Sequence, residues 1–193
     1  MKSEITSVLL VGVGGQGVLL ASEITARAAL AAGYTVKTNE VHGMAQRGGS
    51  VTAHVRYGEE VFSPLVPMGE ASVLGSLEEV EPIRYHNLLK PGGLAVVSAQ
   101  RIIPTTVSTG QATYPADAKD RLKRVFPNLV YFDAVEEARS LGNPQAANLV
   151  ILGAMSTALT LPADAWKESI GACVKPKFLE LNLRAFARGR ELA

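Results

Sequence analysis

The first part of the chain alternates short apolar runs with an amphipathic stretch. Residues 7–13 (SVLLVGV) are apolar and bounded by glycines, which is typical of a buried strand. Residues 18–33 (VLLASEITARAALAAG) place apolar side chains at helical spacing and end on a glycine, a common helix stop. Residues 34–41 (YTVKTNEV) are rich in β-branched residues and predict a second strand. The pattern therefore predicts strand, glycine turn, helix and strand, which is one right-handed βαβ unit.

A different pattern follows at residues 51–57 (VTAHVRY), where apolar and polar side chains alternate. This period of two predicts a strand with one face in solvent, and His54 lies on the solvated face in this interpretation. Gly58 and Glu59 offer a turn, so residues 60–63 (EVFS) are the expected hairpin partner. The hairpin breaks the simple doubly wound pattern and indicates a mixed sheet.

The rest of the chain continues with strands and helices in alternation and then becomes mainly helical. The expected strands are 71–77, 94–100 and 128–134, and the expected helices are 78–89, ended by KPGG, and 116–126. Residues 101–115 are expected to form a loop that could include one edge strand. Residues 135–193 are expected to be mainly helical. These elements predict an α/β fold: a three-layer Rossmann-like sandwich with a mostly parallel, partly mixed sheet. Residues 1–193 are expected to form a single domain.

Composition changes this picture by exclusion. The 193 residues are 47% hydrophobic and 19% charged, as in ordinary globular proteins, and the net charge of +1 gives no electrostatic footprint for nucleic acid. No apolar stretch reaches the roughly 18 residues of a membrane span, and the glycine-rich start does not resemble a signal peptide. We therefore expect a cytoplasmic protein that binds neither membranes nor nucleic acids.

The single cysteine, Cys173, excludes an intrachain disulfide and cannot supply the four thiolates of an iron–sulfur cluster. We expect it to be a small core residue. The three histidines, His42, His54 and His86, lack the spacing of a zinc site. No metal site is therefore expected in this chain.

The glycine turn carries the first candidate chemistry. Gly12, Gly14 and Gly17 fit G-x-G-x-x-G between a strand and a helix, where glycine lets the backbone approach a ligand and the helix offers free N–H groups to an anion. Glu40, at the end of the next strand, is then a candidate partner for the ribose of a dinucleotide. However, residues 14–17 (GGQG) carry a polar side chain where dinucleotide sites often have an apolar one. The alternative is that the glycines only permit close packing of strand and helix.

Residues 42–50 (HGMAQRGGS) form the second candidate loop. Arg47 can hold a carboxylate or phosphate in a fork of hydrogen bonds beside the exposed N–H groups of Gly48 and Gly49. His42 can donate a hydrogen bond or move a proton near neutral pH. The alternative is that Arg47 pairs with a carboxylate at a subunit interface and that His42 caps a turn.

A second set of polar residues is expected to serve structure. Its members are Glu78, Glu79 and Glu81, as negative charge near a helix N-terminus, and Asn148 and Asn182, between packed helices.

Several segments together resemble one family: GVGGQGVLLASEI, NEVHGMAQRGGSV, SPLV, NLVILGA and NLRAFARG. They are similar to the small, cofactor-free gamma-type subunit of 2-oxoacid:ferredoxin oxidoreductases, and within that family to the beta subunit of the indolepyruvate-specific branch. The resemblance covers essentially the whole chain.

The resemblance implies a reaction that this chain does not perform alone. In such enzymes thiamine diphosphate attacks the ketone of a 2-oxoacid, CO₂ leaves, iron–sulfur clusters carry electrons to ferredoxin, and coenzyme A accepts the acyl group. With one cysteine and no GDG signature, this chain is expected to hold no cofactor. Thiamine diphosphate, Mg²⁺ and 4Fe-4S clusters are then expected on an alpha-type partner subunit.

The HGMAQRGGS form resembles the arylpyruvate branch more than the 2-oxoglutarate branch, so the expected substrate is indolepyruvate or a similar aryl 2-oxoacid. Branched-chain 2-oxoacids stay open. Two other classes also stay open: a free-standing NAD(P)- or flavin-binding oxidoreductase, and a non-catalytic ligand-binding or assembly module.

The resemblance assigns two sets of residues to the site. The glycine loop comprises Gly12, Gly14, Gly15, Gln16 and Gly17. The loop that faces the partner or the passage for substrate and coenzyme A comprises His42, Gly43, Gln46, Arg47, Gly48, Gly49 and Ser50.

Overall fold

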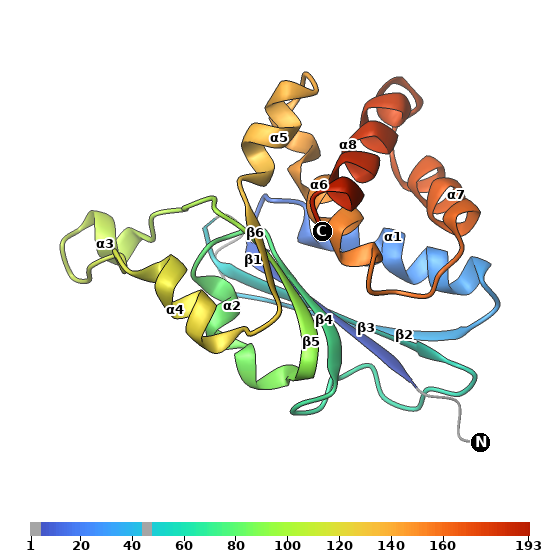
Figure 1. The fold of residues 1–193 in the computed structure, drawn as a ribbon, viewed down its shortest axis with the longest axis horizontal. Helices are drawn as coiled ribbons and strands as arrows, with labels where there is room; N and C mark the ends of the chain where they lie inside the picture. Colours follow the sequence, from blue (N-terminus) through green and yellow to red (C-terminus); the bar gives the residue numbers. More distant parts are fainter. Residues whose placement is uncertain (1–4, 44–47) are drawn as a thin grey trace.

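A computed structural model describes residues 5–43 and 48–193 as one layered α/β fold (Figure 1). The described residues form a six-stranded sheet in the order β2-β3-β1-β4-β5-β6. The strands are β1 (Thr6–Val13), β2 (Thr35–His42), β3 (Ser50–Gly58), β4 (Ala71–Ser76), β5 (Leu89–Ser98) and β6 (Leu129–Phe132). The predicted fold class is confirmed, including the mixed sheet, because β1, β4, β5 and β6 are parallel and β3 is antiparallel to both of its neighbours.

The position of β3 corrects the prediction of a simple βαβ unit. β2 runs in the same direction as β1, but β3 lies between them and pairs with both along its length. The reason is local: β3 follows β2 after a short connection and folds back on it as an antiparallel hairpin. The predicted hairpin partner at residues 60–63 is wrong for the same reason, since both edges of β3 are already occupied.

One face of the sheet carries most of the helices, at the top of Figure 1. These are α1 (Val18–Ala31), α5 (Ala134–Ser140), α6 (Ala147–Ser156), α7 (Ala163–Cys173) and α8 (Leu179–Glu191), with single turns η2 (Pro144–Ala146) and η3 (Pro176–Phe178). Every residue of α6 is buried, because this helix lies between the sheet and α8. The prediction of a mainly helical C-terminal part is confirmed. No helix among the described residues is long and apolar enough to cross a membrane.

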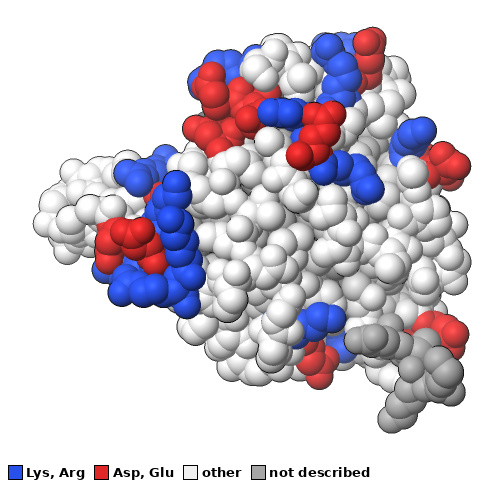
Figure 2. Space-filling view, viewed as in Figure 1, with Lys and Arg blue, Asp and Glu red and all other residues white. Residues whose placement is uncertain are grey.

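The second face is covered by shorter elements: α2 (Glu81–Arg84), η1 (His86–Leu88), α4 (Ala118–Val125) and the non-helical residues 59–70. The short helix α3 (Thr105–Ser108) has no buried residue and projects to the left of the sheet in Figure 1. Leu122 and Phe126, at α4, belong here to one core cluster with Leu9 and Val11 of β1, and the charged side chains of α4 lie on its outer side (Figure 2). This second core completes the three-layer arrangement. Residues 101–115 contain α3 and no strand, so the edge strand allowed for by the sequence is absent.

The predicted long helix at residues 78–89 is also wrong. It is replaced by α2 and η1, because Pro82 stands at the start of α2 and the Glu78 carboxylate accepts the backbone N–H groups of Val80 and Glu81. The KPGG sequence lies inside β5 and does not end a helix; Gly92 has a φ of +75° there.

The alternating strand β3 does not have a solvated face. His54 is 9% exposed and Arg56 is 8% exposed, so the prediction of a solvated His54 is wrong. A central strand has both faces covered, and residues 59–70 cover the face that holds these two side chains. The alternating pattern correctly predicted a strand, but it did not predict that residues 59–70 would cover its polar face.

Candidate functional site

The glycine turn connects β1 to α1 at the carboxyl edge of the sheet. Gly15 and Gly17 have φ of +98° and +85°, in the left-handed region that favours glycine. A Cβ on Gly17 would lie 2.5 Å from Nδ2 of Asn148, whereas one on Gly15 would meet no described heavy atom within 4 Å. Thus Gly17 is required for packing against α6, and Gly15 leaves the turn open on its outer side. No described side chain caps the start of α1, so its first N–H groups stay available to a ligand.

The side chain of Gln16 makes its hydrogen bonds inside the protein. Its Oε1 accepts the N–H of Val13 at 2.7 Å, and its Nε2 donates to the carbonyl of Leu77 at 2.6 Å and to Oε1 of Gln100 at 2.8 Å. These bonds tie the ends of β1, β4 and β5 together. Gln16, the polar residue that distinguishes this turn from an ordinary dinucleotide loop, therefore stabilises the turn by internal hydrogen bonds.

The described part of the second loop lies beside the glycine turn. The N–H of Gly14 donates to the carbonyl of Gly49 at 2.9 Å, and the N–H of Gly43 donates to the carbonyl of Ser50 at 3.3 Å. The Ser50 hydroxyl donates to the Glu81 carboxylate at 2.5 Å. The structure thus brings together the predicted residues Gly12, Gly14, Gly15, Gln16, Gly17, His42, Gly43, Gly48, Gly49 and Ser50 at one edge of the sheet. Gln46 and Arg47 lie outside the described residues.

Two hollows flank the glycine turn, and both include Gly14, Gly15 and Gly17 in their walls. The first, about 400 Å³, is mainly apolar, and the exposed residue His42 forms part of its wall. The second, about 580 Å³, carries the amide side chains of Gln16, Gln100, Gln145 and Asn148. Among the described residues, neither hollow is lined by a lysine, arginine or carboxylate. This edge can accept an uncharged group or offer backbone N–H groups to an anion.

Glu40 does not support the dinucleotide interpretation. It is exposed on β2, opposite Ala53 of β3, so a complete strand separates it from β1 and its turn. Neighbouring strands lie about 4.8 Å apart, which puts β2 roughly 10 Å from β1. The acidic residue of a dinucleotide site belongs on the adjacent strand. The proposed ribose partner is therefore wrong.

Glu78 and Glu79 form a buried acidic cluster behind the turn. The sequence predicted their position near a helix N-terminus but not their other partners. The Glu78 carboxylate caps the start of α2, as predicted, and also accepts the hydroxyl of Tyr114 at 2.7 Å. The carboxylate of fully buried Glu79 accepts hydrogen bonds from Nε of Arg101 at 2.5 Å and from the hydroxyl of Tyr131 at 2.6 Å.

Burial, followed by the hydrogen bonds to these carboxylates, raises the pKa of the Tyr114 and Tyr131 hydroxyls well above the usual range. The two tyrosines are held as neutral donors. The cluster therefore fixes residues 101–114 and β6 against β4, and sequence spacing alone gave no sign of this.

The other sequence-derived assignments have mixed outcomes. Asn148 donates to the carbonyl of Gly17 at 3.3 Å, so its predicted role between packed helices is confirmed. Asn182 instead donates to the carbonyl of Phe178 at the start of its own helix. Cys173 was predicted to be a core residue, but it is only half-buried at the margin of the main core, where burial raises the pKa of its thiol. No group of three or more metal-ligating side chains occurs within residues 5–43 and 48–193.

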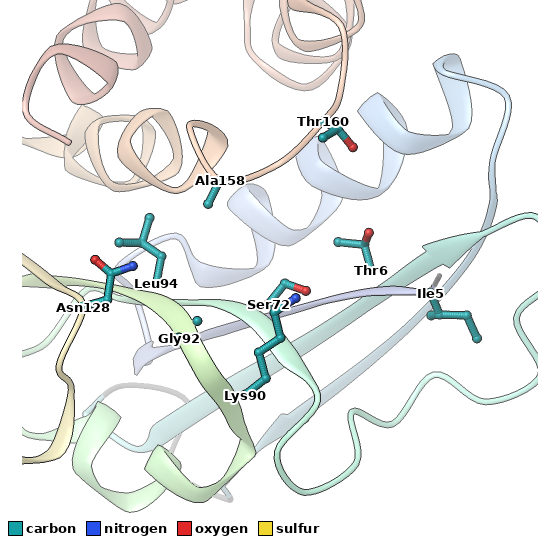
Figure 3. Close-up of a pocket in the computed structure, with 10 residues that line it drawn as sticks. Ile5, Thr6, Ser72, Lys90, Gly92, Leu94, Asn128, Ala158 and Thr160 are labelled. Carbon is teal, nitrogen blue, oxygen red and sulfur yellow. The ribbon is translucent and has the colours of Figure 1, made fainter. Parts of the chain in front are cut away.

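Figure 3 shows a further hollow of about 320 Å³ at the opposite edge of the sheet. Thr6, Ser72, Lys90 and Asn128 line it, together with the start of the connection from α6 to α7 at Ala158. Its one described charged group is the ammonium of Lys90. Because parallel α/β sheets bind ligands at the carboxyl ends of their strands, this amino-end hollow is the weaker candidate.

Comparisons with known proteins show the family of this chain. Residues 7–192 match the Pyruvate ferredoxin/flavodoxin oxidoreductase family. The chain is 43% identical over 97% of its length to the indolepyruvate oxidoreductase subunit IorB of Thermococcus kodakarensis, and covers 95% of that protein.

Solved structures show the same fold. A keto/oxoacid ferredoxin oxidoreductase gamma subunit from Geobacter sulfurreducens aligns with a TM-score of 0.71 and 26% identity, over 97% of this chain and 98% of that one. The 2-oxoglutarate:ferredoxin oxidoreductase of Magnetococcus marinus aligns with a TM-score of 0.74 and 20% identity, over 98% of this chain but only 31% of that longer chain. By the extent of these matches, this chain belongs to the Pyruvate ferredoxin/flavodoxin oxidoreductase family.

Proposed function

We propose that this chain is the cofactor-free subunit of an indolepyruvate:ferredoxin oxidoreductase. The observation that carries the proposal is the 43% identity to an indolepyruvate oxidoreductase subunit along nearly the whole of both chains. The overall reaction converts an aryl 2-oxoacid, coenzyme A and two oxidised ferredoxins into an aryl acyl-CoA, CO₂, one proton and two reduced ferredoxins. Thiamine diphosphate, Mg²⁺ and the iron–sulfur clusters belong to an alpha-type partner subunit in this proposal.

The residues of this chain do not fit those cofactors. An iron–sulfur cluster needs several thiolates, and the sequence holds one cysteine, which is half-buried in a raised-pKa environment. Mg²⁺ is held by carboxylate and other oxygen ligands, but Glu78 and Glu79 are already occupied by backbone N–H groups, tyrosine hydroxyls and Arg101. No step of the reaction is therefore assigned to a cofactor in this chain.

The carboxyl edge is suited to the passage of coenzyme A and substrate. The open turn at Gly15 and the uncapped start of α1 offer backbone N–H groups to a phosphate, and the amide-lined hollow suits an uncharged, amide-containing chain. Because the described lining residues carry no cation, the charge for a phosphate or a substrate carboxylate comes from Arg47 in this proposal. His42 lines the apolar hollow, and in this proposal it is the hydrogen-bond donor to a ligand there.

The direct test is reconstitution with the cofactor-bearing partner subunit. Neither chain alone should reduce methyl viologen with indolepyruvate and coenzyme A, and the mixture should do so faster with indolepyruvate than with pyruvate, 2-oxoglutarate or 2-oxoisovalerate. Oxidation of a 2-oxoacid by the isolated chain would exclude the proposal. Micromolar binding of NAD(P) or flavin, measured by calorimetry, would favour the free-standing oxidoreductase. An unchanged rate on addition of the chain would favour the assembly module.

The roles of Arg47 and His42 can be tested in the same complex. Arg47→Ala should raise the Michaelis constant for coenzyme A or for the 2-oxoacid by about 10-fold or more, as expected for loss of a charge-assisted hydrogen bond. His42→Gln should have a smaller effect. Arg27→Ala is the matched control, because Arg27 is exposed on α1 and pairs only with Glu23 among the described residues. Unchanged Michaelis constants and unchanged assembly with Arg47→Ala would exclude its role.

A further inference from the structure

The hollow at the amino edge of the sheet owes its shape to an irregularity in β5 (Figure 3). The pairing of β5 with β4 is interrupted between Leu89 and Leu94, so that residues 90–93 (KPGG) lie opposite Ser72 of β4 and form a bulge. Gly92 permits this path, because its φ of +75° is in the left-handed region. Bulges often lie beside binding sites, where they redirect side chains. The hollow bounded by this bulge is here called the KPGG hollow.

The KPGG hollow gathers polar side chains that have no partner. Lys90, Ser72, Asn128 and Thr160 line it, and none of these side chains has a hydrogen-bond or ion-pair partner among the described residues. Lys90 and Ser72 are half-buried. Figure 3 shows the side chain of Lys90 directed towards Ser72, with Asn128 and Thr160 on opposite sides of them. A few convergent polar groups in a hollow are typical of a site for a small molecule.

The charge and size of the KPGG hollow indicate the class of ligand. Lys90 is the only charged residue in the described lining, so the hollow offers one ammonium and no carboxylate. One ammonium balances the single charge of a carboxylate, whereas a phosphate monoester carries nearly two negative charges at neutral pH. The hydroxyls of Ser72 and Thr160 and the amide of Asn128 can both donate and accept, which matches ligand hydroxyl groups. The volume of about 320 Å³ suits a small ligand.

We propose that the KPGG hollow binds a small hydroxycarboxylate. The carboxylate of the ligand pairs with the ammonium of Lys90, and its hydroxyl groups bond to the side chains of Ser72 and Asn128. The proposal does not depend on the proposed function, because the hollow lies at the edge of the sheet opposite the glycine turn and shares no lining residue with the two hollows there. It gives a role to the KPGG sequence, which does not end a helix.

The test is a titration of the complete chain with glycerate, which has one carboxylate and two neighbouring hydroxyl groups. Amide signals in nuclear magnetic resonance spectra should shift at Ser72, at residues 90–94 and at Asn128, with a dissociation constant in the millimolar range. Propionate lacks the hydroxyl groups and glycerol lacks the charge, so each should bind about 10-fold more weakly than glycerate. Inorganic phosphate should also bind more weakly than glycerate.

Three variants of the chain test the residues. Lys90→Met should raise the dissociation constant for glycerate by about 10-fold, since it removes a charge-assisted hydrogen bond, and Ser72→Ala should raise it by about 3-fold. Lys37→Met is the matched control, because it makes the same change in net charge at an exposed position of β2 outside the hollow. Melting temperatures show whether each variant is folded, and Ser72→Ala remains a test if Lys90→Met is not.

The outcomes decide the proposal without affecting the proposed function. Glycerate that causes no shift at residues 90–94 at millimolar concentrations overturns it. Equal affinities for glycerate and propionate, or tighter binding of inorganic phosphate than of glycerate, also overturn it. The same holds if folded Lys90→Met or Ser72→Ala binds glycerate as tightly as the unaltered chain. Preferred binding of glycerate that both variants weaken, with Lys37→Met unchanged, supports the proposal.

Discussion

The glycine turn and residues 59–70, the outer segment, both use polar side chains for internal hydrogen bonds. They differ in the chemical character of the surface that they expose. At the turn, Gln16 is consumed by internal hydrogen bonds, and what faces outward is backbone and small, uncharged groups. At the outer segment, Arg56 and His54 are consumed internally, and what faces outward is apolar. The comparison shows that Gln16, His54 and Arg56, which are polar in the sequence, hold the fold together through internal hydrogen bonds. The exposed groups are glycine backbone in one region and the side chains of Phe62, Leu65 and Met68 in the other.

Gly17→Ala should have the largest effect, because it attacks the turn itself. The substitution combines a left-handed φ with a Cβ that would lie 2.5 Å from Nδ2 of Asn148, and should lower the free energy of unfolding by about 3 kcal/mol. Gly15→Ala is the matched control, with backbone strain but no described clash, and should cost about 1 kcal/mol. Urea denaturation measures both. Equal losses would mean that the contact with Asn148 does not matter.

Arg56→Met should come next and should act on the outer segment. It keeps much of the side-chain volume but leaves the carbonyls of Ser63 and Leu65 without their donor, at a cost of about 2–3 kcal/mol. Proteolysis within residues 59–70 should also become faster. Arg121→Met, at an exposed pair with Asp117, is the control and should change little. A segment that stayed protected in Arg56→Met would show that its buried valines alone hold it.

Gln16→Ala should lower the free energy of unfolding by about 2 kcal/mol. The variant leaves the N–H of Val13 and the carbonyl of Leu77 without their partner at a half-buried position. Gln145→Ala is the comparison, because Gln145 lines the same hollow but is exposed. If the two variants were equally stable, Gln16 would be available for a ligand and the contrast between the two regions would weaken.

The smallest expected effect is a pH dependence from His54. Burial lowers the pKa of His54, so the folded protein keeps this ring neutral while the unfolded chain takes up a proton near its ordinary pKa of about 6.5. Stability should therefore be complete above about pH 7 and should fall as the pH decreases from there towards the lowered folded pKa. His54→Gln retains a hydrogen-bond acceptor without that titration, so the difference in stability between variant and unaltered chain should change over this range. A difference independent of pH would contradict the assignment.

The segments that carry the family resemblance can now be given physical reasons. NLVILGA and NLRAFARG fall in α6 and α8, and these two helices cross at Gly153 and Gly189. A Cβ on Gly189 would lie 1.9 Å from the carbonyl oxygen of Val150, so only glycine permits this approach. The sequence identified both segments but gave no indication that they contact each other.

The resemblance of whole segments gave the family, and local pattern by itself determined the β1–turn–α1 unit, α4, β6 and the helical C-terminal part. These depend on periodicity, caps and glycine positions that act over a few residues. The tertiary structure alone decided that β3 separates β1 from β2, that His54, Arg56, Glu78 and Glu79 are buried, and that the outer segment turns its apolar side chains outward. Strand pairing and the covering of a sheet face depend on contacts between residues far apart in the chain. Local sequence patterns do not reveal which distant residues come into contact.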